Sequence, residues 1–152
     1  MDLQKFSEEK YEELLNLHRE LCLIPAPSYF EDERASYILK YLQDCGIDNA
    51  YIDETKNVIC MMGKPSDKII TFMAHSDTVF PIETTLNYID DGGKIHCPGV
   101  GDDTASLAVM LICIKYMKEN GILPERTLMF VANSCEEGLG NLKGVKEIFK
   151  TY

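Results

Sequence analysis

The feature that most constrains the fold is the alternation of short apolar runs with one long apolar segment. The runs IITFMA (69–74) and TLMFVA (127–132) are rich in β-branched and aromatic residues, as buried strands are. Between them, residues 103–121 are strongly apolar and long enough for a helix, and the small residues Ala105 and Ser106 at its start would permit close packing against a sheet. A strand, a helix and a strand in this order predict an α/β fold with a covered sheet.

The rest of the chain extends this pattern. Apolar residues recur at helical spacing in two N-terminal segments, and the prolines of IPAPS (24–28) separate these segments. We expect helices at 7–22, 29–45 and 141–152, strands at 50–54 and 57–63, and a hairpin at 86–97. The expected fold is therefore a covered mixed sheet with helices on both faces.

Composition and charge exclude several classes of protein. The chain has 152 residues, which suits one domain, and its 25 acidic and 15 basic side chains give a net charge of −10. No basic cluster is present, so we expect no nucleic-acid partner. No apolar stretch reaches the length of a membrane span, and the polar, acidic N-terminus does not look like a secretory signal. The six cysteines form no C-x-x-C pair, which indicates reduced thiols and a cytoplasmic location.

Three polar clusters lie at the ends of the predicted apolar elements. His75 and Asp77 follow the first strand, an aspartate pair at 102–103 precedes the apolar helix, and a glutamate pair at 136–137 follows the second strand. In open α/β sheets, ligands bind beyond the carboxyl ends of the strands. We therefore expect the three clusters to converge on one site.

The residue types in these clusters suit a metal such as zinc. A histidine supplies a nitrogen ligand, and carboxylates supply oxygen ligands that neutralise the ion. Asp77 lies two residues from His75 along an extended chain and could accept the second ring N–H of that histidine. Adjacent carboxylates repel each other when they are buried alone, and a cation removes this cost.

Each cluster alone has an ordinary structural explanation. His75 and Asp77 could form a solvated turn, the aspartate pair could cap the following helix, and the glutamate pair could lie in a loop. Their joint position at element ends favours a metal site. The glycines of PGVGDDT (98–104) do not favour a phosphate site, because the third glycine of the dinucleotide fingerprint is absent and two aspartates would repel an anion. We expect His18 at the surface or its boundary, and a structural role for His96.

Three motifs resemble one known family. MAHSDTVFP (73–81), GVGDDTASLAVML (99–111) and ANSCEEGLGNLKG (132–144) are similar to motifs of the di-zinc peptidases and deacylases. This family includes peptidase T, carboxypeptidase G, acetylornithine deacetylase and succinyl-diaminopimelate desuccinylase. The resemblance implies a zinc-exopeptidase catalytic domain with a phosphorylase/hydrolase-like fold. It covers essentially the whole chain.

The resemblance also implies a role for each site residue. His75 would bind one zinc ion, and Asp77 would orient the His75 ring. Asp102 would bridge the two zinc ions, and Glu137 would bind the second ion. Glu136 would act as the general base toward water and then pass the proton to the leaving amine. The reaction would be hydrolysis of a peptide or N-acyl amide bond.

Two departures from the family pattern affect these expectations. Many relatives have a lysine near position 104, where this chain has Thr104, although this position is not a ligand. The family also needs a further aspartate ligand, a C-terminal histidine and a lid or dimerisation domain. Residues 1–152 would then form the N-terminal part of a catalytic domain without the lid, with two ligands for each zinc where catalytic sites use three.

The leading interpretation is a peptidase T-like aminopeptidase or dipeptidase that acts on a small peptide or N-acyl amino acid, with weak or no activity in the isolated chain. The alternative is a truncated, non-catalytic metal-binding or interaction module. In either case an incomplete sheet leaves an edge and an apolar face to be covered. We therefore expect a homo-oligomer or association with the missing half, and no membrane partner.

Overall fold

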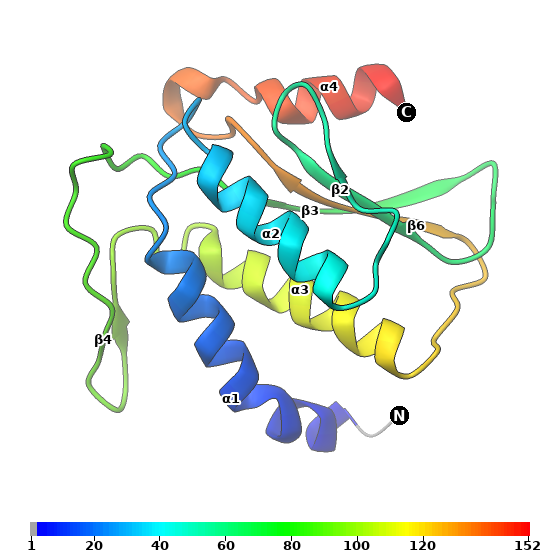
Figure 1. Cartoon of the computed structure of the whole chain (residues 1–152), viewed down its shortest axis with the longest axis horizontal. Coiled ribbons are helices and arrows are strands. Elements are labelled where there is room, and N and C mark those ends of the chain that lie inside the picture. The colour runs from blue at the N-terminus through cyan, green and yellow to red at the C-terminus, as the bar shows by residue number, and fades with distance from the viewer. Residues whose placement is uncertain (1–2) are drawn as a thin grey trace.

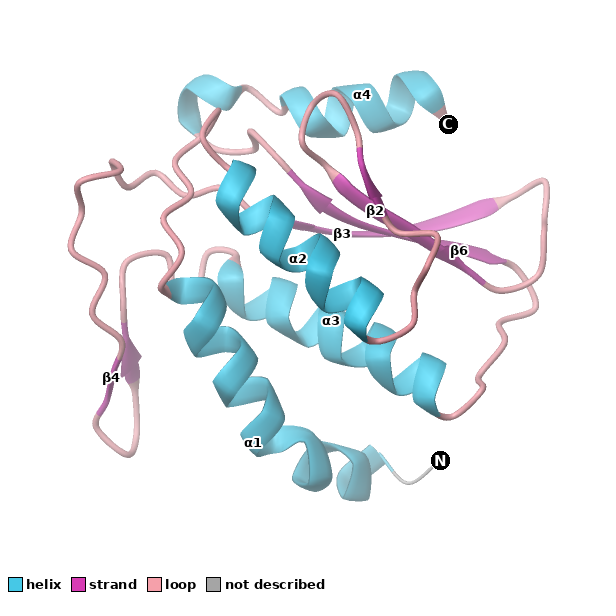
Figure 2. Ribbon diagram, viewed as in Figure 1, coloured by secondary structure: helices cyan, strands magenta, loops and turns pink. Residues whose placement is uncertain are grey.

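The computed structural model describes residues 3–152 and contains helices and strands in mixed order. The helices are α1 (Leu3–Cys22), α2 (Asp32–Asp44), α3 (Thr104–Glu119) and α4 (Lys143–Thr151), with a short 3-10 helix η1 (Gly138–Gly140) before α4. The strands are β1 (Tyr51–Ile52), β2 (Val58–Met62), β3 (Ile69–His75), β4 (Ile89–Asp90), β5 (Ile95–His96) and β6 (Thr127–Asn133). Figure 1 shows their arrangement, and Figure 2 separates helices, strands and loops.

The main sheet is mixed, as the sequence predicts. Its strand order is β1-β2-β6-β3, with β2 antiparallel to β6 and β3 parallel to β6. The chain passes from β3 through α3 to β6, which is the crossover that a parallel pair needs. Strands β4 and β5 form a separate hairpin at the predicted position.

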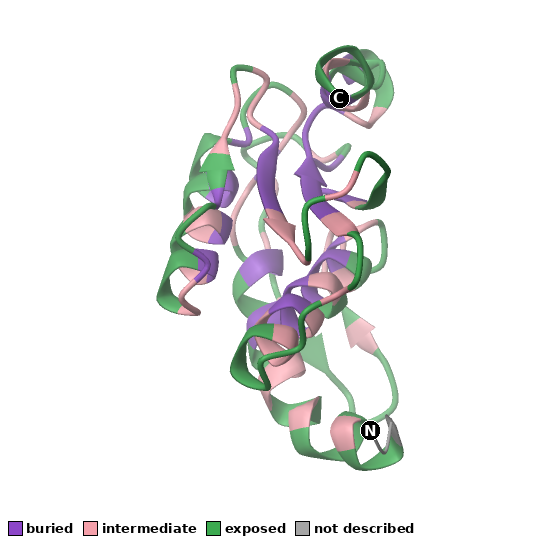
Figure 3. Cartoon of the chain, turned by 90° about the vertical axis from the view of Figure 1, so that its right-hand side faces the viewer, coloured by how far each residue is buried: buried purple, intermediate pink, exposed green. Residues whose placement is uncertain are grey.

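Helices cover both faces of this sheet (Figure 1). On one face, a core cluster joins side chains of α1, α2 and α3 to Val58, Cys60, Ala74 and Phe130 of the strands. On the other face, Ile148 of α4 packs against alternate residues of β2 and β6. Figure 3 shows the buried residues concentrated in the strands and on the helix sides that face them. The period-2 alternation of strand side chains explains why both faces are apolar.

Helix α3 packs through a different small residue from the one expected. Ala108 is fully buried beside Leu107 and Leu111, whereas Ser106 is exposed. Ala105 and Ser106 instead line an apolar groove between α3 and β3. Helix α3 therefore packs in the core through Leu107, Ala108 and Leu111, and not through Ala105 and Ser106.

Two helix boundaries also differ from the prediction. Helix α1 already begins at Leu3, so Ser7 lies inside it and its hydroxyl donates to the Gln4 carbonyl. Helix α2 begins only at Asp32, because Tyr29 has a φ of 74°, which no helix can contain. The Tyr29 N–H is accepted by the Glu31 side chain instead. Apolar periodicity reports neither the earlier start of α1 nor the left-handed backbone conformation of Tyr29.

Strand β3 is an edge of the described sheet. Among the strands that the structure describes, it pairs only with β6. Its apolar side chains Ile69, Ile70 and Phe72 are exposed. One apolar groove lies between β3 and α3, and a second lies between β3 and α4, beside the exposed Phe149. The edge therefore shows apolar surface on both faces of the sheet.

None of the helices within residues 3–152 combines the length and the apolar character that a bilayer span requires.

The burial of α3 predicts how its residues contribute to stability. Leu107 is 0% exposed and Val109, on the same helix, is 48% exposed. We expect Leu107→Ala to lower the free energy of unfolding by about 2–5 kcal/mol, because the truncation leaves a cavity. Val109→Ala is the matched control and should change it by less than about 0.5 kcal/mol. Urea denaturation followed by circular dichroism measures both, and equal effects would contradict this packing.

Candidate metal centre

The parallel pairing of β3 with β6 positions the candidate site. In the register of this pair, His75 lies opposite Asn133, so both strands end at the same edge of the sheet. The chain continues from His75 into Asp77, and from Asn133 into the glutamate pair. Helix α3 begins beside this edge, directly after the aspartate pair. The three polar clusters therefore meet as expected.

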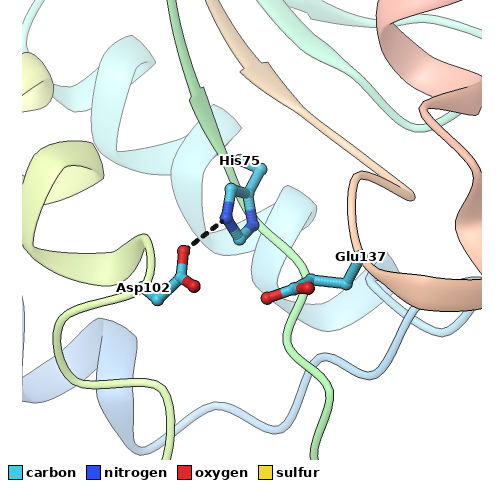
Figure 4. A group of neighbouring side chains, drawn as sticks. All are labelled: His75, Asp102 and Glu137. Atoms are coloured by element: carbon cyan, nitrogen blue, oxygen red, sulfur yellow. Dashed lines mark hydrogen bonds and ion pairs between the residues drawn. The ribbon is translucent and has the colours of Figure 1, made fainter.

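Three side chains from these clusters come close enough to share an ion. The Nε2 atom of His75 lies 3.0 Å from Oδ1 of Asp102. One potential ligand atom from each of His75, Asp102 and Glu137 lies within 4.8 Å of the other two. Figure 4 shows the imidazole between the two carboxylates, which come from separate loops.

The other residues of the clusters surround this group. The Nδ1 atom of His75 lies 3.0 Å from the main-chain carbonyl oxygen of Asp77 and 3.6 Å from its carboxylate. Nδ1 can thus donate to Asp77, which leaves Nε2 directed toward the carboxylates. The Glu136 carboxylate lies 3.8 Å from Nε2 of His75. Asp103 does not cap α3 through its side chain, and instead accepts the main-chain N–H of His75.

The electrostatics of the site reflect this crowding of acids. Burial alone would lower the pKa of His75, but its interactions with Asp77 and Asp102 outweigh burial and raise the pKa to about 9. Burial and the nearby Asp102 carboxylate raise the pKa of Glu137. For Asp77, burial opposes a low pKa, but hydrogen bonds from His75, Ser28 and two main-chain N–H groups lower it. The carboxylates of Asp77, Asp102 and Glu136 thus surround the imidazole of His75.

Asp77 also holds the loop that carries the glutamates. Its two carboxylate oxygens accept the main-chain N–H groups of Glu136, at 2.9 Å, and Glu137, at 3.0 Å. The Ser28 hydroxyl donates to the same carboxylate at 2.6 Å. In the sequence, Ser28 looks only like part of the turn after the first helix. Its position in IPAPS, far from the clusters in the chain, carried no signal of this contact.

The residues present fit a zinc ion. An imidazole nitrogen and carboxylate oxygens are ligand types that zinc prefers. The donor atoms converge, and the like-charged carboxylates of Asp102 and Glu137 repel each other when no cation lies between them. His75, Asp102 and Glu137 are therefore the residues that would hold the metal.

The two other histidines lie elsewhere. His18 is buried, which contradicts the expectation of a surface or boundary position. Its Nδ1 lies 3.0 Å from the Tyr88 hydroxyl and its Nε2 lies 2.8 Å from the Val100 carbonyl, so it ties α1 to the loop before Asp102. His96 lies in the β4–β5 hairpin beside Asp91, with an exposed side chain.

Comparison with known proteins identifies the family. The sequence profile of Peptidase family M20/M25/M40 matches residues 71–152, which include all three clusters. The chain belongs to this family. The resemblance seen in the motifs is thereby confirmed, and so is the expected fold class.

Individual relatives agree with this assignment. A probable carboxypeptidase from Ajellomyces dermatitidis is 33% identical over 147 residues, which cover 84% of this chain and 33% of the relative. The crystal structure of aminopeptidase PepT from Bacillus cereus superposes with a TM-score of 0.72 at 30% identity, over 89% of this chain and 39% of that one. A tripeptidase from Staphylococcus aureus gives a TM-score of 0.69 at 29% identity, over 88% and 39%. The chain thus spans between 33% and 39% of the length of these proteins.

The charges around His75 predict its titration in chelator-treated protein. We expect its imidazole to titrate near pH 9, above its ordinary value near 6.5. Because the folded-state pKa is raised, the protonated ring stabilises the fold below about pH 6.5, and this stabilisation is lost as the pH rises through about 9. Proton NMR of the ring measures the pKa. Asp102→Asn should lower it, and a wild-type value at or below 6.5 would contradict the described contacts.

Proposed function

We propose that this chain carries part of the active site of a zinc-dependent hydrolase of peptide or N-acyl amide bonds. The observation that carries the proposal is the convergence of His75, Asp102 and Glu137 with Glu136 beside them, in a segment that matches the family. The likeness to aminopeptidase PepT and to a tripeptidase, at 30% and 29% identity, favours short peptides and a peptidase T-like activity.

In this proposal the chain would offer ligands to two zinc ions. His75 would hold one ion, Glu137 would hold the other, and Asp102 would contribute to both. Zinc polarises a scissile carbonyl and lowers the pKa of water to about 7. Asp77 orients His75 through Nδ1, which leaves Nε2 free to act as a ligand.

Glu136 is the proposed general base. Its side chain is partly exposed, so water and substrate can reach it, while its main-chain N–H is held by Asp77. An ionised carboxylate in this position can take a proton from water and then deliver it to the leaving amine. The adjacent Glu137 would be a zinc ligand, so the two neighbouring glutamates would have different roles.

The ligand count limits what the isolated chain can do. Residues 3–152 offer two ligands to each proposed ion, whereas catalytic zinc sites use three. We propose that the further ligands come from another part of a longer polypeptide or from a second copy, and that the isolated chain is weakly active or inactive. The same shortage favours the second candidate function, a non-catalytic metal-binding or interaction module.

A cytoplasmic location is part of the proposal. The six cysteines are unpaired, as expected in a reducing compartment. Burial raises the pKa of Cys60 to about 12, and burial together with the neighbouring Glu31 raises that of Cys135 to about 11, which keeps both in the unreactive thiol form.

Metal binding and turnover together test the proposed function. We expect isothermal titration of the 152-residue chain with zinc to show binding that Asp102→Asn weakens at least about tenfold, because it removes the shared ligand. Glu125→Gln changes an exposed acid paired with Lys64 and serves as the control. In the complete protein, Glu136→Gln should lower turnover of di- and tripeptides by about 10²–10⁴-fold and leave zinc binding intact.

The outcomes separate the two candidate functions. Zinc-dependent turnover of any di- or tripeptide or N-acyl amino acid by the complete protein supports the hydrolase. Zinc binding with no turnover on the whole panel supports the metal-binding module. Equal zinc affinity in the wild type and Asp102→Asn would contradict both.

We further propose that the β3 edge is covered in the working protein, by more of the same polypeptide or by a second copy. The exposed Ile70 and Phe72 and the apolar groove beside them support this. For the 152-residue chain we expect self-association in light scattering. Phe72→Lys should reduce it, while Tyr11→Lys, which changes a similarly exposed aromatic on α1, should not. A wild-type chain that stays monomeric would exclude the second copy, and equal association of both variants would exclude the β3 edge.

A further inference from the structure

Four consecutive main-chain N–H groups after β6 are accepted by buried side chains rather than by a sheet or a helix. Ser134 donates to Asn57 Oδ1 at 3.0 Å, Cys135 donates to Glu31 Oε1 at 3.0 Å, and the two glutamates that follow donate to Asp77. Asn57, Glu31 and Asp77 are each 0% exposed. Three distant segments thus fix the path of this loop.

Glu31 is the least expected of these acceptors. It stands at the N-cap position of α2, yet its side chain makes no capping hydrogen bond. Oε1 instead accepts the N–H of Tyr29 and both the N–H and the S–H of Cys135. Oε2 has no hydrogen-bond partner in the described chain, and the nearest cation, Lys56 Nζ, is 3.8 Å away. A buried carboxylate with one unpaired oxygen is costly, so its position needs a reason beyond helix capping.

Cys135, which Glu31 holds, is the point where the loop bends. Its φ of 51° lies in the left-handed region, which is unfavourable for a side chain with a Cβ. Its carbonyl accepts the N–H of Lys143, and a Cβ on Gly140 would lie only 2.6 Å from its main chain. The next residues are Glu136 and Glu137, so a rotation at Cys135 would move both carboxylates relative to His75.

We propose that Glu31 is a positioning residue of the metal centre. Its buried carboxylate fixes the bend at Cys135 and thereby sets the direction in which Glu136 and Glu137 approach His75. Glu31 touches neither the metal ligands nor a substrate, and it acts only through the Cys135 main chain and thiol. This inference rests on the proposed function, because it assumes that Glu137 is a zinc ligand.

The test compares three substitutions in the 152-residue chain. Glu31→Gln keeps an acceptor oxygen of the same reach, so zinc affinity should stay within about threefold of the wild type. Glu31→Leu removes the acceptor, and Glu31→Asp keeps the charge but shortens the reach. Both should weaken zinc binding, by about 10–100-fold for Glu31→Leu, as the loss of outer partners does at other metal sites. A competing chromophoric chelator measures the affinities, and the visible spectrum of the cobalt-loaded chain reports the coordination geometry.

A purely structural role for Glu31 would give a different pattern. Ile114→Ala removes a buried core side chain about three turns along α3 from the aspartate pair, so below its melting temperature it should bind zinc as the wild type does. If Glu31→Leu and Ile114→Ala lose thermal stability equally and both keep wild-type zinc affinity and cobalt spectra, the proposal is wrong. If Glu31→Leu does not fold, Glu31→Asp decides, and wild-type affinity in that variant overturns the proposal. Absence of zinc binding by the wild type would instead refute the proposed metal centre itself.

Discussion

The parallel pairing of β3 with β6 is the constraint on which the site depends. Because two parallel strands end at the same edge, the register that places His75 opposite Asn133 also brings the loops after both strands together. The crossover through α3 adds the aspartate pair at the start of that helix. Residues separated by about sixty positions in the chain thus become neighbours through the strand pairing, and the Asp77 side chain then fixes the loop that carries the glutamates. The apolar residues of β3 and β6 indirectly hold a polar site in place.

A second layer of buried polar groups determines how the ligands are presented. Asp77 and Glu31 are buried and accept N–H groups of this loop. Asp102 is exposed, and Glu136 and Glu137 are partly exposed. The carboxylates of Asp77, Asp102 and Glu136 all lie within 3.8 Å of the His75 imidazole, and the nearby Asp102 carboxylate adds to burial in raising the pKa of Glu137. A cation between the outer carboxylates would relieve this repulsion. The fold therefore brings together side chains whose charges favour a bound cation.

Sequence reasoning predicted the parts of the structure that depend on local pattern. The apolar runs gave β3, α3 and β6, and the acid clusters at their ends correctly indicated a shared site. It could not predict contacts made by ordinary polar residues over long separations. Ser28, Glu31 and Asn57 look like turn or cap residues in the sequence, and only the fold brings them to the loop after β6. His18 was placed wrongly for the same reason, since its partners lie in a distant loop.

The most direct test of the central claim is anomalous diffraction at the zinc absorption edge from crystals of the 152-residue chain soaked in zinc. The claim predicts a peak at about 2.0–2.2 Å from His75 Nε2 and from an Asp102 oxygen, with any second peak between Asp102 and Glu137. A metal peak elsewhere on the molecule, with His75 still bonded directly to Asp102, would contradict it.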